Sequence, residues 1–253
     1  MSITILSPYR LFFIDEAGKL WTVLKDGRVR FIKNFESFQT IASDKKTLCG
    51  VQFYGEDTQV IQTDLTFEEP DSSPLFCGKG YFYYPNLWVP KKQKLAIVKA
   101  DLLNPQGTGD LIIYEKARTK FHPQVKIPAK IAPSVWNTKT KELFYLTAKN
   151  ALACTDGKSG QIITDQANLF TLNQNGTEVA YYHQDCITMV SLENGIHQHC
   201  LAFDVTALGY DAISPILYFA THKDKSAIYQ FDKRTGEVSL VLNHSNPIRL
   251  ITG

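Results

Sequence analysis

Two histidines that stand close to acids are the first residues in this sequence that could do chemistry. His183 lies two residues before Asp185, and His222 lies two residues before Asp224. An imidazole beside a carboxylate can serve as a general acid or base when a nucleophile lies within hydrogen-bond reach. Each pair follows an apolar run directly, where a turn normally carries polar residues, and no nucleophile stands in a recognisable setting. We interpret both pairs as turn residues and predict that the protein is not an enzyme.

Metal ligation is the second chemistry to consider. In His197-Gln198-His199 both imidazoles would share one face of a strand, as a metal pair needs, but third and fourth ligands are not evident. The cysteines are odd in number, widely spaced and without a Cys-x-x-Cys pair, which favours free thiols that pack as small hydrophobes. The sequence therefore predicts no metal site and no cofactor. The five cysteines are Cys49, Cys77, Cys154, Cys186 and Cys200.

Charge is distributed unevenly along the chain. Residues 47–78 contain acids but no Lys or Arg, whereas residues 79–130 contain ten Lys or Arg against three acids. An acidic surface attracts a basic partner and raises the rate and selectivity of association. We predict that the acids of the first stretch contact a partner; the alternative is that exposed edges and loops carry charge in any case. These acids are Glu56, Asp57, Asp64, Glu68, Glu69 and Asp71.

Aromatic residues gather next to the junction of the two charged stretches. Tyr84 and Trp88 join the predicted partner contacts, because buried aromatic anchors carry much of the energy of protein interfaces. The favoured interpretation of the group as a whole is packing between neighbouring sheets. Its members are Phe76, Tyr81, Phe82, Tyr83, Tyr84 and Trp88.

The overall composition bears on several classes of partner. The net charge of +2 is too small to indicate general attraction to nucleic acid or to anionic membranes. No apolar run approaches the roughly 18 residues of a membrane span, and the first residues lack the basic segment of a signal peptide. We expect a cytoplasmic protein that binds neither nucleic acid nor membrane.

These side chains must be positioned by short β-strands, because the chain alternates brief apolar runs with turn residues. A four-strand pattern recurs, with second strands starting near residues 11, 49, 95, 143, 178 and 216. This spacing of roughly 35 to 48 residues suits the four-stranded blades of a β-propeller.

The two ends of the chain complement each other in this repeat. Residues 11–14, 20–23 and 29–32 match second, third and fourth strands, whereas residues 248–252 match a first strand with no followers. Pairing the last strand with the first blade would leave no open edge there. The sequence predicts an all-β fold, a six-bladed β-propeller that forms a single domain over residues 1–253 and is closed by its C-terminal strand.

Two stretches resemble the TolB-like superfamily of six-bladed β-propellers. Residues 173–182 are similar to that family's turn-then-strand signature, and residues 232–238 are similar to its last hairpin. The resemblance covers residues 133–252 and implies a fold. Some six-bladed propellers are lactonases or esterases that hold calcium in the central tunnel, but no ligand set carries over to this sequence.

The leading prediction of function is a non-enzymatic module that binds another protein. A propeller presents a rigid face made of loops, which suits this role. Its most specific form is an immunity protein that neutralises a basic toxin, such as a nuclease. The alternatives are a metal-dependent lactonase or hydrolase and a propeller that binds a glycan or small ligand.

Overall fold

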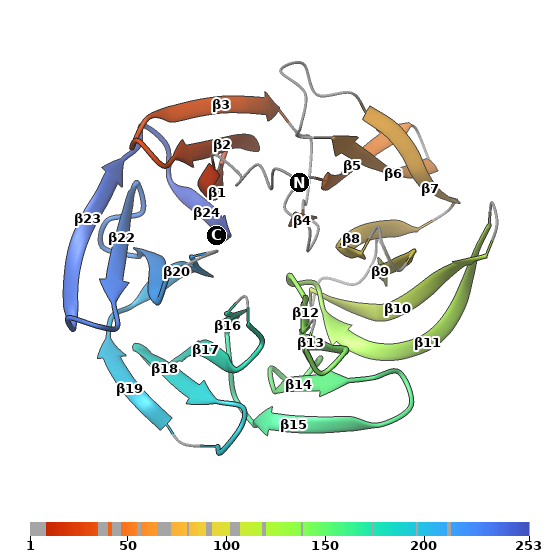
Figure 1. Ribbon diagram of the computed structural model, residues 1–253. Coiled ribbons are helices and arrows are strands. Elements are labelled where there is room, and N and C mark those ends of the chain that lie inside the picture. The colour runs from red at the N-terminus through yellow and green to blue at the C-terminus, as the bar shows by residue number, and fades with distance from the viewer. Residues whose placement is uncertain are drawn as a thin grey trace, which may run out of the picture. The chain divides into compact units, whose positions relative to one another are not determined.

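The protein consists of strands and short turns in every part that the structure describes. The computed structural model describes residues 9–34, 40–41, 47–54, 57–64, 72–79, 81–89, 93–101, 107–117, 120–137, 139–173, 175–195, 197–211 and 214–252. The strands form six four-stranded antiparallel sheets (Figure 1). Within these ranges no helix is long and apolar enough to cross a membrane. The chain divides into two compact units, Met1–Asn34 with Leu169–Gly253, and Phe35–Asn168.

The first unit holds three sheets. In spatial order, one contains β24 (Ile248–Thr252), β1 (Tyr9–Asp15), β2 (Lys19–Leu24) and β3 (Val29–Asn34). The next contains β16 (Leu169–Leu172), β17 (Glu178–His183), β18 (Cys186–Ser191) and β19 (His197–Ala202). The third contains β20 (Val205–Tyr210), β21 (Ile216–Thr221), β22 (Ala227–Asp232) and β23 (Glu237–Asn243).

The second unit holds the other three sheets. One contains β4 (Thr40–Ile41), β5 (Thr47–Tyr54), β6 (Asp57–Asp64) and β7 (Ser72–Lys79). The next contains β8 (Phe82–Val89), β9 (Lys94–Ala100), β10 (Thr108–Ala117) and β11 (Lys120–Lys130). The last contains β12 (Val135–Asn137), β13 (Glu142–Leu146), β14 (Leu152–Thr155) and β15 (Gly160–Thr164).

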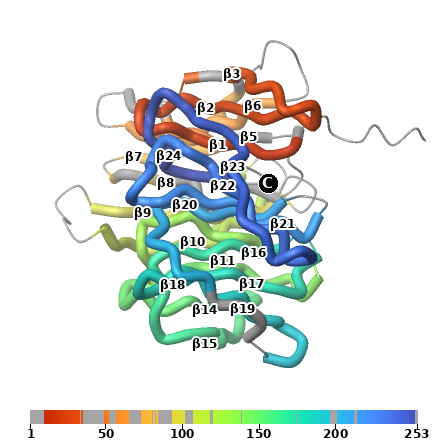
Figure 2. The backbone as a smooth tube through the Cα atoms, turned by 90° about the vertical axis from the view of Figure 1, so that its left-hand side faces the viewer, coloured from red at the N-terminus to blue at the C-terminus, as the bar shows by residue number. Residues whose placement is uncertain are grey.

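The C-terminal strand completes the N-terminal sheet, as the sequence predicts. β24 pairs antiparallel with β1, so that Leu250 lies opposite Ile14 and Thr252 opposite Phe12 (Figures 1 and 2). β20 crosses β24 so closely that a Cβ atom at Gly209 would lie 2.7 Å from the carbonyl oxygen of Ile251. Only glycine fits such an approach of two backbones.

Burial falls from the second strand to the fourth in the sheets whose side chains are described on both strands. Four of the five residues of β13 are buried, whereas β15, the outer strand of the same sheet, is largely exposed. β21 and β23 differ in the same way. Second strands are therefore continuous apolar runs in the sequence, because neighbouring sheets stack on them and cover both faces of the strand. The four apolar clusters combine side chains of neighbouring sheets, which shows where the cores lie.

The first hairpin turn of three successive sheets is closed by an Asn or Asp side chain. Asn137 accepts hydrogen bonds from the backbone amides of Lys139 and Thr140. Asn173 does the same in the next sheet, and Asp211 accepts one from the amide of Ser214. Such local hydrogen bonds replace the strand ladder at a turn and hold its shape.

Candidate functional site

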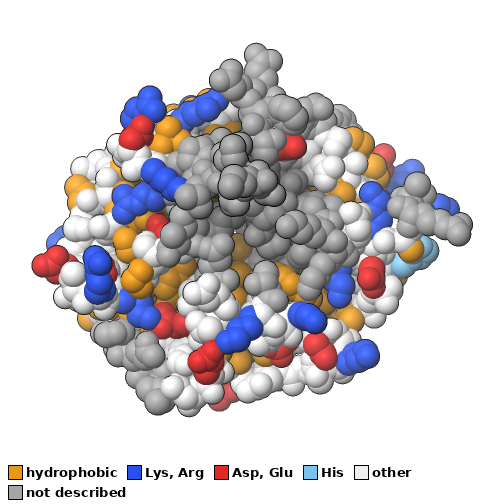
Figure 3. Space-filling view, in the orientation of Figure 1, with side chains coloured by type: hydrophobic (Ala, Val, Ile, Leu, Met, Phe, Trp, Pro, Cys, Tyr) orange, Lys and Arg blue, Asp and Glu red, His pale blue; other side chains and the backbone are white. Residues whose placement is uncertain are grey.

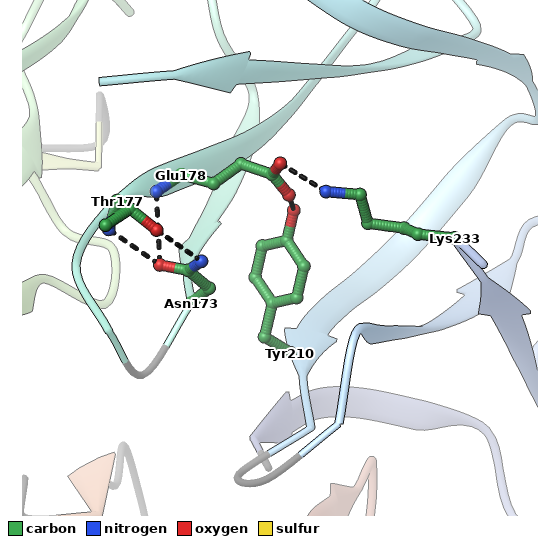
Figure 4. Close-up of polar contacts among 5 residues, drawn as sticks. All are labelled: Asn173, Thr177, Glu178, Tyr210 and Lys233. Carbon is green, nitrogen blue, oxygen red and sulfur yellow. Dashed lines mark hydrogen bonds and ion pairs between the residues drawn. The ribbon is translucent and has the colours of Figure 1, made fainter. Parts of the chain in front are cut away.

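A buried ion pair with a tyrosine beside it joins two sheets of the first unit. Glu178 is the first residue of β17, Tyr210 is the last of β20, and Lys233 lies in the turn after β22 (Figure 4). The Glu178 carboxylate accepts a hydrogen bond from the Tyr210 hydroxyl and forms an ion pair with Lys233. The side chains of Glu178 and Lys233 are only 8% and 17% exposed.

The turn before Glu178 fixes the backbone position from which the Glu178 side chain extends. The side-chain oxygen of Asn173 accepts hydrogen bonds from the amides of Thr177 (2.9 Å) and Glu178 (3.1 Å), and its Nδ2 donates to the Thr177 hydroxyl (3.1 Å) (Figure 4). The turn is therefore rigid, and Glu178 projects from a fixed backbone position.

The two sequence stretches that resemble the TolB-like family meet at this pair, since Glu178 belongs to one and Lys233 to the other. Sequence reasoning interpreted each stretch as a turn signature and missed their contact. One signal was present: Glu178 is an acid at the head of an otherwise apolar second strand, which demands a buried partner.

The chemistry of this group is structural. Burial raises the pKa of Tyr210, and the charge of Glu178 raises it further, so the hydroxyl stays protonated and donates its hydrogen bond. A tyrosine in that state is neither a base nor a nucleophile. The three side chains together fasten the sheet that begins with β16 to the sheet that begins with β20.

A second buried carboxylate fastens the two chain ends. Asp15, fully buried at the end of β1, accepts hydrogen bonds from the Lys19 amide (2.9 Å), Trp21 Nε1 (3.1 Å) and Asn246 Nδ2 (3.1 Å). His244 Nε2 lies 3.3 Å from the same carboxylate. Burial alone would raise the pKa of Asp15, but these hydrogen bonds outweigh burial and lower it. Asp15 thus ties β1 and β2 to the loop before β24.

A third hydrogen-bond network links β1 to β21 and β22. Arg10 donates through Nε to the Tyr218 hydroxyl (2.7 Å) and through Nη2 to Gln230. The Tyr218 hydroxyl donates in turn to Asp211 (2.6 Å). Burial, followed by the hydrogen bond to Asp211, raises the pKa of Tyr218. This tyrosine also acts as a protonated linker between sheets.

The predicted histidine–acid pairs make other contacts. His222 Nε2 lies 3.7 Å from the carboxylate of Asp204 rather than beside Asp224. The carboxylate of Asp224 accepts a hydrogen bond from the Tyr229 hydroxyl. Asp185 accepts one from Tyr182, while Nδ1 of His183 is buried without a hydrogen-bond partner among the described residues. Asp185 has a φ of 59° in the tight turn that joins β17 to β18. The interpretation of these residues as turn residues agrees with their positions.

The predicted partner contacts fall partly inside the described residues. Asp57 and Asp64 are the first and last residues of β6, which separates them by about 23 Å along the strand. Asp57 is exposed and Asp64 half-buried. Glu56, Glu68, Glu69 and Asp71 lie outside the described residues, and the side chains of Tyr84 and Trp88 in β8 do as well. The structure does not bring the two described acids together.

Packing between sheets accounts for part of the aromatic group. Tyr83 is buried against β5, β6 and β9, and Phe76 packs on it with ring centroids 5.4 Å apart. Tyr81 is different, because it is 41% exposed and the ammonium of Lys99 lies 3.6 Å from its ring centroid. The side chain of Phe82 lies outside the described residues. The packing interpretation is confirmed for Tyr83 and Phe76.

One cysteine differs from the sequence interpretation. Cys49, Cys77 and Cys154 are free thiols, whereas Cys186 is disulfide-bonded. Free thiols were expected throughout because no short cysteine spacing is present, but a disulfide requires only that two cysteines lie close in space, not in sequence. The predicted cytoplasmic location stays a prediction.

The described residues include no group of three or more His, Cys, Asp or Glu side chains arranged to hold a metal ion. The side chains of His197 and His199 lie outside the described residues. On the face shown in Figure 3, basic and acidic side chains are interspersed where the surface is described.

Comparison with known proteins extends the picture of the fold. No family model matches the sequence. A 50-residue stretch, 20% of this chain, is 40% identical to ribose-5-phosphate isomerase A of Prochlorococcus marinus and spans 21% of that protein. The match thus spans about a fifth of the isomerase and gives no ground for assigning the isomerase activity to this chain.

Solved structures match nearly the whole chain. TolB from Acinetobacter baumannii matches 96% of it at a TM-score of 0.74 and 12% identity, over 66% of the TolB chain. A chain of a nidogen/laminin complex matches 96% at 0.70 and 11% identity, over 97% of that chain. A candidate 6-phosphogluconolactonase from Bacteroides fragilis matches 95% at 0.58 and 11% identity, over 82% of that chain.

At these identities the similarity shows the fold alone. The six four-stranded antiparallel sheets are the blades of a six-bladed β-propeller, as the sequence predicts. The resemblance to TolB-like propellers is confirmed at the level of the fold. This fold serves both a candidate lactonase and a protein found in a complex, so the fold does not decide function.

Proposed function

We propose that this protein is a non-enzymatic β-propeller that binds another protein. The observation that carries the proposal is the use of its buried ionisable groups. Glu178, Tyr210 and Lys233 hold two blades together, and Asp15 does the same for the two chain ends. These buried groups form contacts within the protein and make the scaffold rigid. A rigid scaffold loses little conformational entropy when it binds a partner.

The similarity to a chain from a nidogen/laminin complex supports a protein partner. The acidic stretch of residues 56–71 supports a basic one, because charges of opposite sign steer two proteins together. Asp57 is the described member of that stretch with an exposed side chain. Asp57 is therefore the first residue whose charge should be reversed by mutation.

Co-purification from the native host, followed by binding kinetics with the captured protein, tests the proposal. Asp57→Lys should slow association with a basic partner several-fold and reduce its dependence on salt. Asp26→Lys is the matched control, since Asp26 is an exposed acid in a hairpin turn of the other unit. A partner that binds both variants and the natural protein alike would remove the acidic stretch from the proposal.

The more specific form of the proposal is an immunity protein whose partner is a basic toxin. Its support is the acidic stretch, because nucleases that bind RNA carry compensating positive charge. Expression of the protein should restore growth to cells that produce the cognate toxin, with Asp57→Lys protecting less well. Death of the cells at the control rate with every toxin encoded nearby would refute this form and leave the general one standing.

Hydrolysis assays with phosphorylated sugar lactones provide the contrary test, since a candidate lactonase shares the fold. Turnover that survives repurification and follows the protein peak would overturn the non-enzymatic proposal.

A further inference from the structure

The outer strands of the blades differ in how well their open edges are protected. The last strand of a sheet presents unpaired backbone groups, and proteins guard such edges with Lys and Pro. β11 is a guarded edge, because it contains two prolines and three lysines in 11 residues. These are Pro123, Pro128, Lys120, Lys126 and Lys130.

β23 has none of these guards. It is the last strand of its sheet and pairs with β22 along one side (Figure 1). Its seven residues include no Lys, Arg or Pro, and its one charged residue, Glu237, stands at its start. Val238 and Leu240 are 41% and 51% exposed. Because alternate residues share a face, both apolar side chains lie on the same side of the strand.

We propose that two copies of this chain form a dimer by antiparallel pairing of β23 with β23. A twofold axis at Ser239 would place Val238 of each copy opposite Leu240 of the other. Directly opposed side chains on neighbouring strands contact each other, so the four exposed apolar groups would cover one another on one face. The ladder between β22 and β23 is regular from Glu237 to Leu240, so this part of the edge is free of bulges.

Charge is compatible with this register. Glu237 of one copy lies opposite Val241 of the other, which separates the two glutamates by about 14 Å along the strands. That exceeds the Debye length of about 10 Å in 0.1 M salt, so the two glutamates repel each other weakly. The same edge can therefore serve both copies, as a twofold interface requires.

Sedimentation of the purified protein over a concentration series tests the dimer. The measured mass should rise from 28.6 kDa toward twice that value. Leu240→Lys should weaken the association about tenfold or more, because it removes apolar contact and adds like charges across the axis. Ile162→Lys on β15 is the matched control, since Ile162 is also 51% exposed on an outer strand, and it should leave the association unchanged.

Cross-linking tests the register itself. With Cys77 replaced by Ser, the variant Ser239→Cys should form a disulfide between two copies, because opposed Cα atoms would be about 5 Å apart. Thr235→Cys, in the turn before β23, should not, because its two copies would be about 27 Å apart.

Three results would overturn the proposal. They are a natural protein that stays monomeric, a dimer that Ile162→Lys weakens as much as Leu240→Lys, and a dimer in which Ser239→Cys forms no cross-link between copies. None of these readouts involves another protein, so the proposed function is tested separately.

Discussion

Removal of Lys233 should destabilise the protein far more than removal of an exposed cation. In Lys233→Met the Glu178 carboxylate, whose side chain is 8% exposed, keeps its hydrogen bond from Tyr210 but loses its counter-charge. A buried charge left without its partner costs about 3–5 kcal/mol. With a urea m-value of about 3 kcal/mol/M, the unfolding midpoint should fall by about 1 to 1.7 M.

The double variant separates the ion pair from simple packing. Glu178→Gln with Lys233→Met leaves no buried charge, so its loss of stability should be at least about 1 kcal/mol smaller than the sum of the two single losses. Urea unfolding followed by circular dichroism measures all four proteins. Arg28→Met is the control, because Arg28 and Asp26 form an exposed ion pair whose loss should leave the unfolding midpoint nearly unchanged. Equal midpoints for Lys233→Met and Arg28→Met, or strictly additive single losses, would refute the reasoning.

Three further predictions concern Asp15 and the cysteines. The pKa of Asp15 is lowered by folding, so its contribution to stability is present above the unfolded pKa of about 3.9 and is lost as pH falls through the folded pKa. Asp15→Asn removes the charge that these donors share and should lower stability at neutral pH by about 1.5–3 kcal/mol, the contribution of a hydrogen bond to a charged group. The difference in stability from the natural protein should disappear in acid during a pH series of urea unfolding. Burial raises the pKa of Cys154 to about 11, so iodoacetamide at pH 8 should modify the exposed Cys77 while Cys154 stays unlabelled in peptide maps, and equal labelling would contradict this. Cys186 should resist alkylation in denatured, unreduced protein and become reactive after reduction; a free Cys186 in protein taken from its native compartment would show that the bond does not form there.

Strand positions and the pairing of the two ends could be predicted from the sequence because their signals are local. Continuous apolar runs such as those of β13 and β21 mark second strands whatever they pack against. The lone strand at residues 248–252 and the missing first strand before β1 follow from counting the repeat, and the ladder between Ile14 and Leu250 confirms that count.

The contacts between blades could not be predicted in the same way. Lys233 lies 55 residues from Glu178, and Asn246 lies 231 residues from Asp15. His222 lies near Asp204 in the preceding loop rather than near Asp224, its neighbour in the chain. Hydrophobic periodicity records which side of a strand is buried and contains no information about which side chain of the next sheet will face it.

The sequence by itself determined the strands, the turns and the fold class, since each depends on residues close together in the chain. Only the tertiary structure decided which charged groups meet, because stacking of the sheets sets those distances. A carboxylate such as that of Glu178 or Asp15 is stable inside the protein only where that stacking supplies its donors.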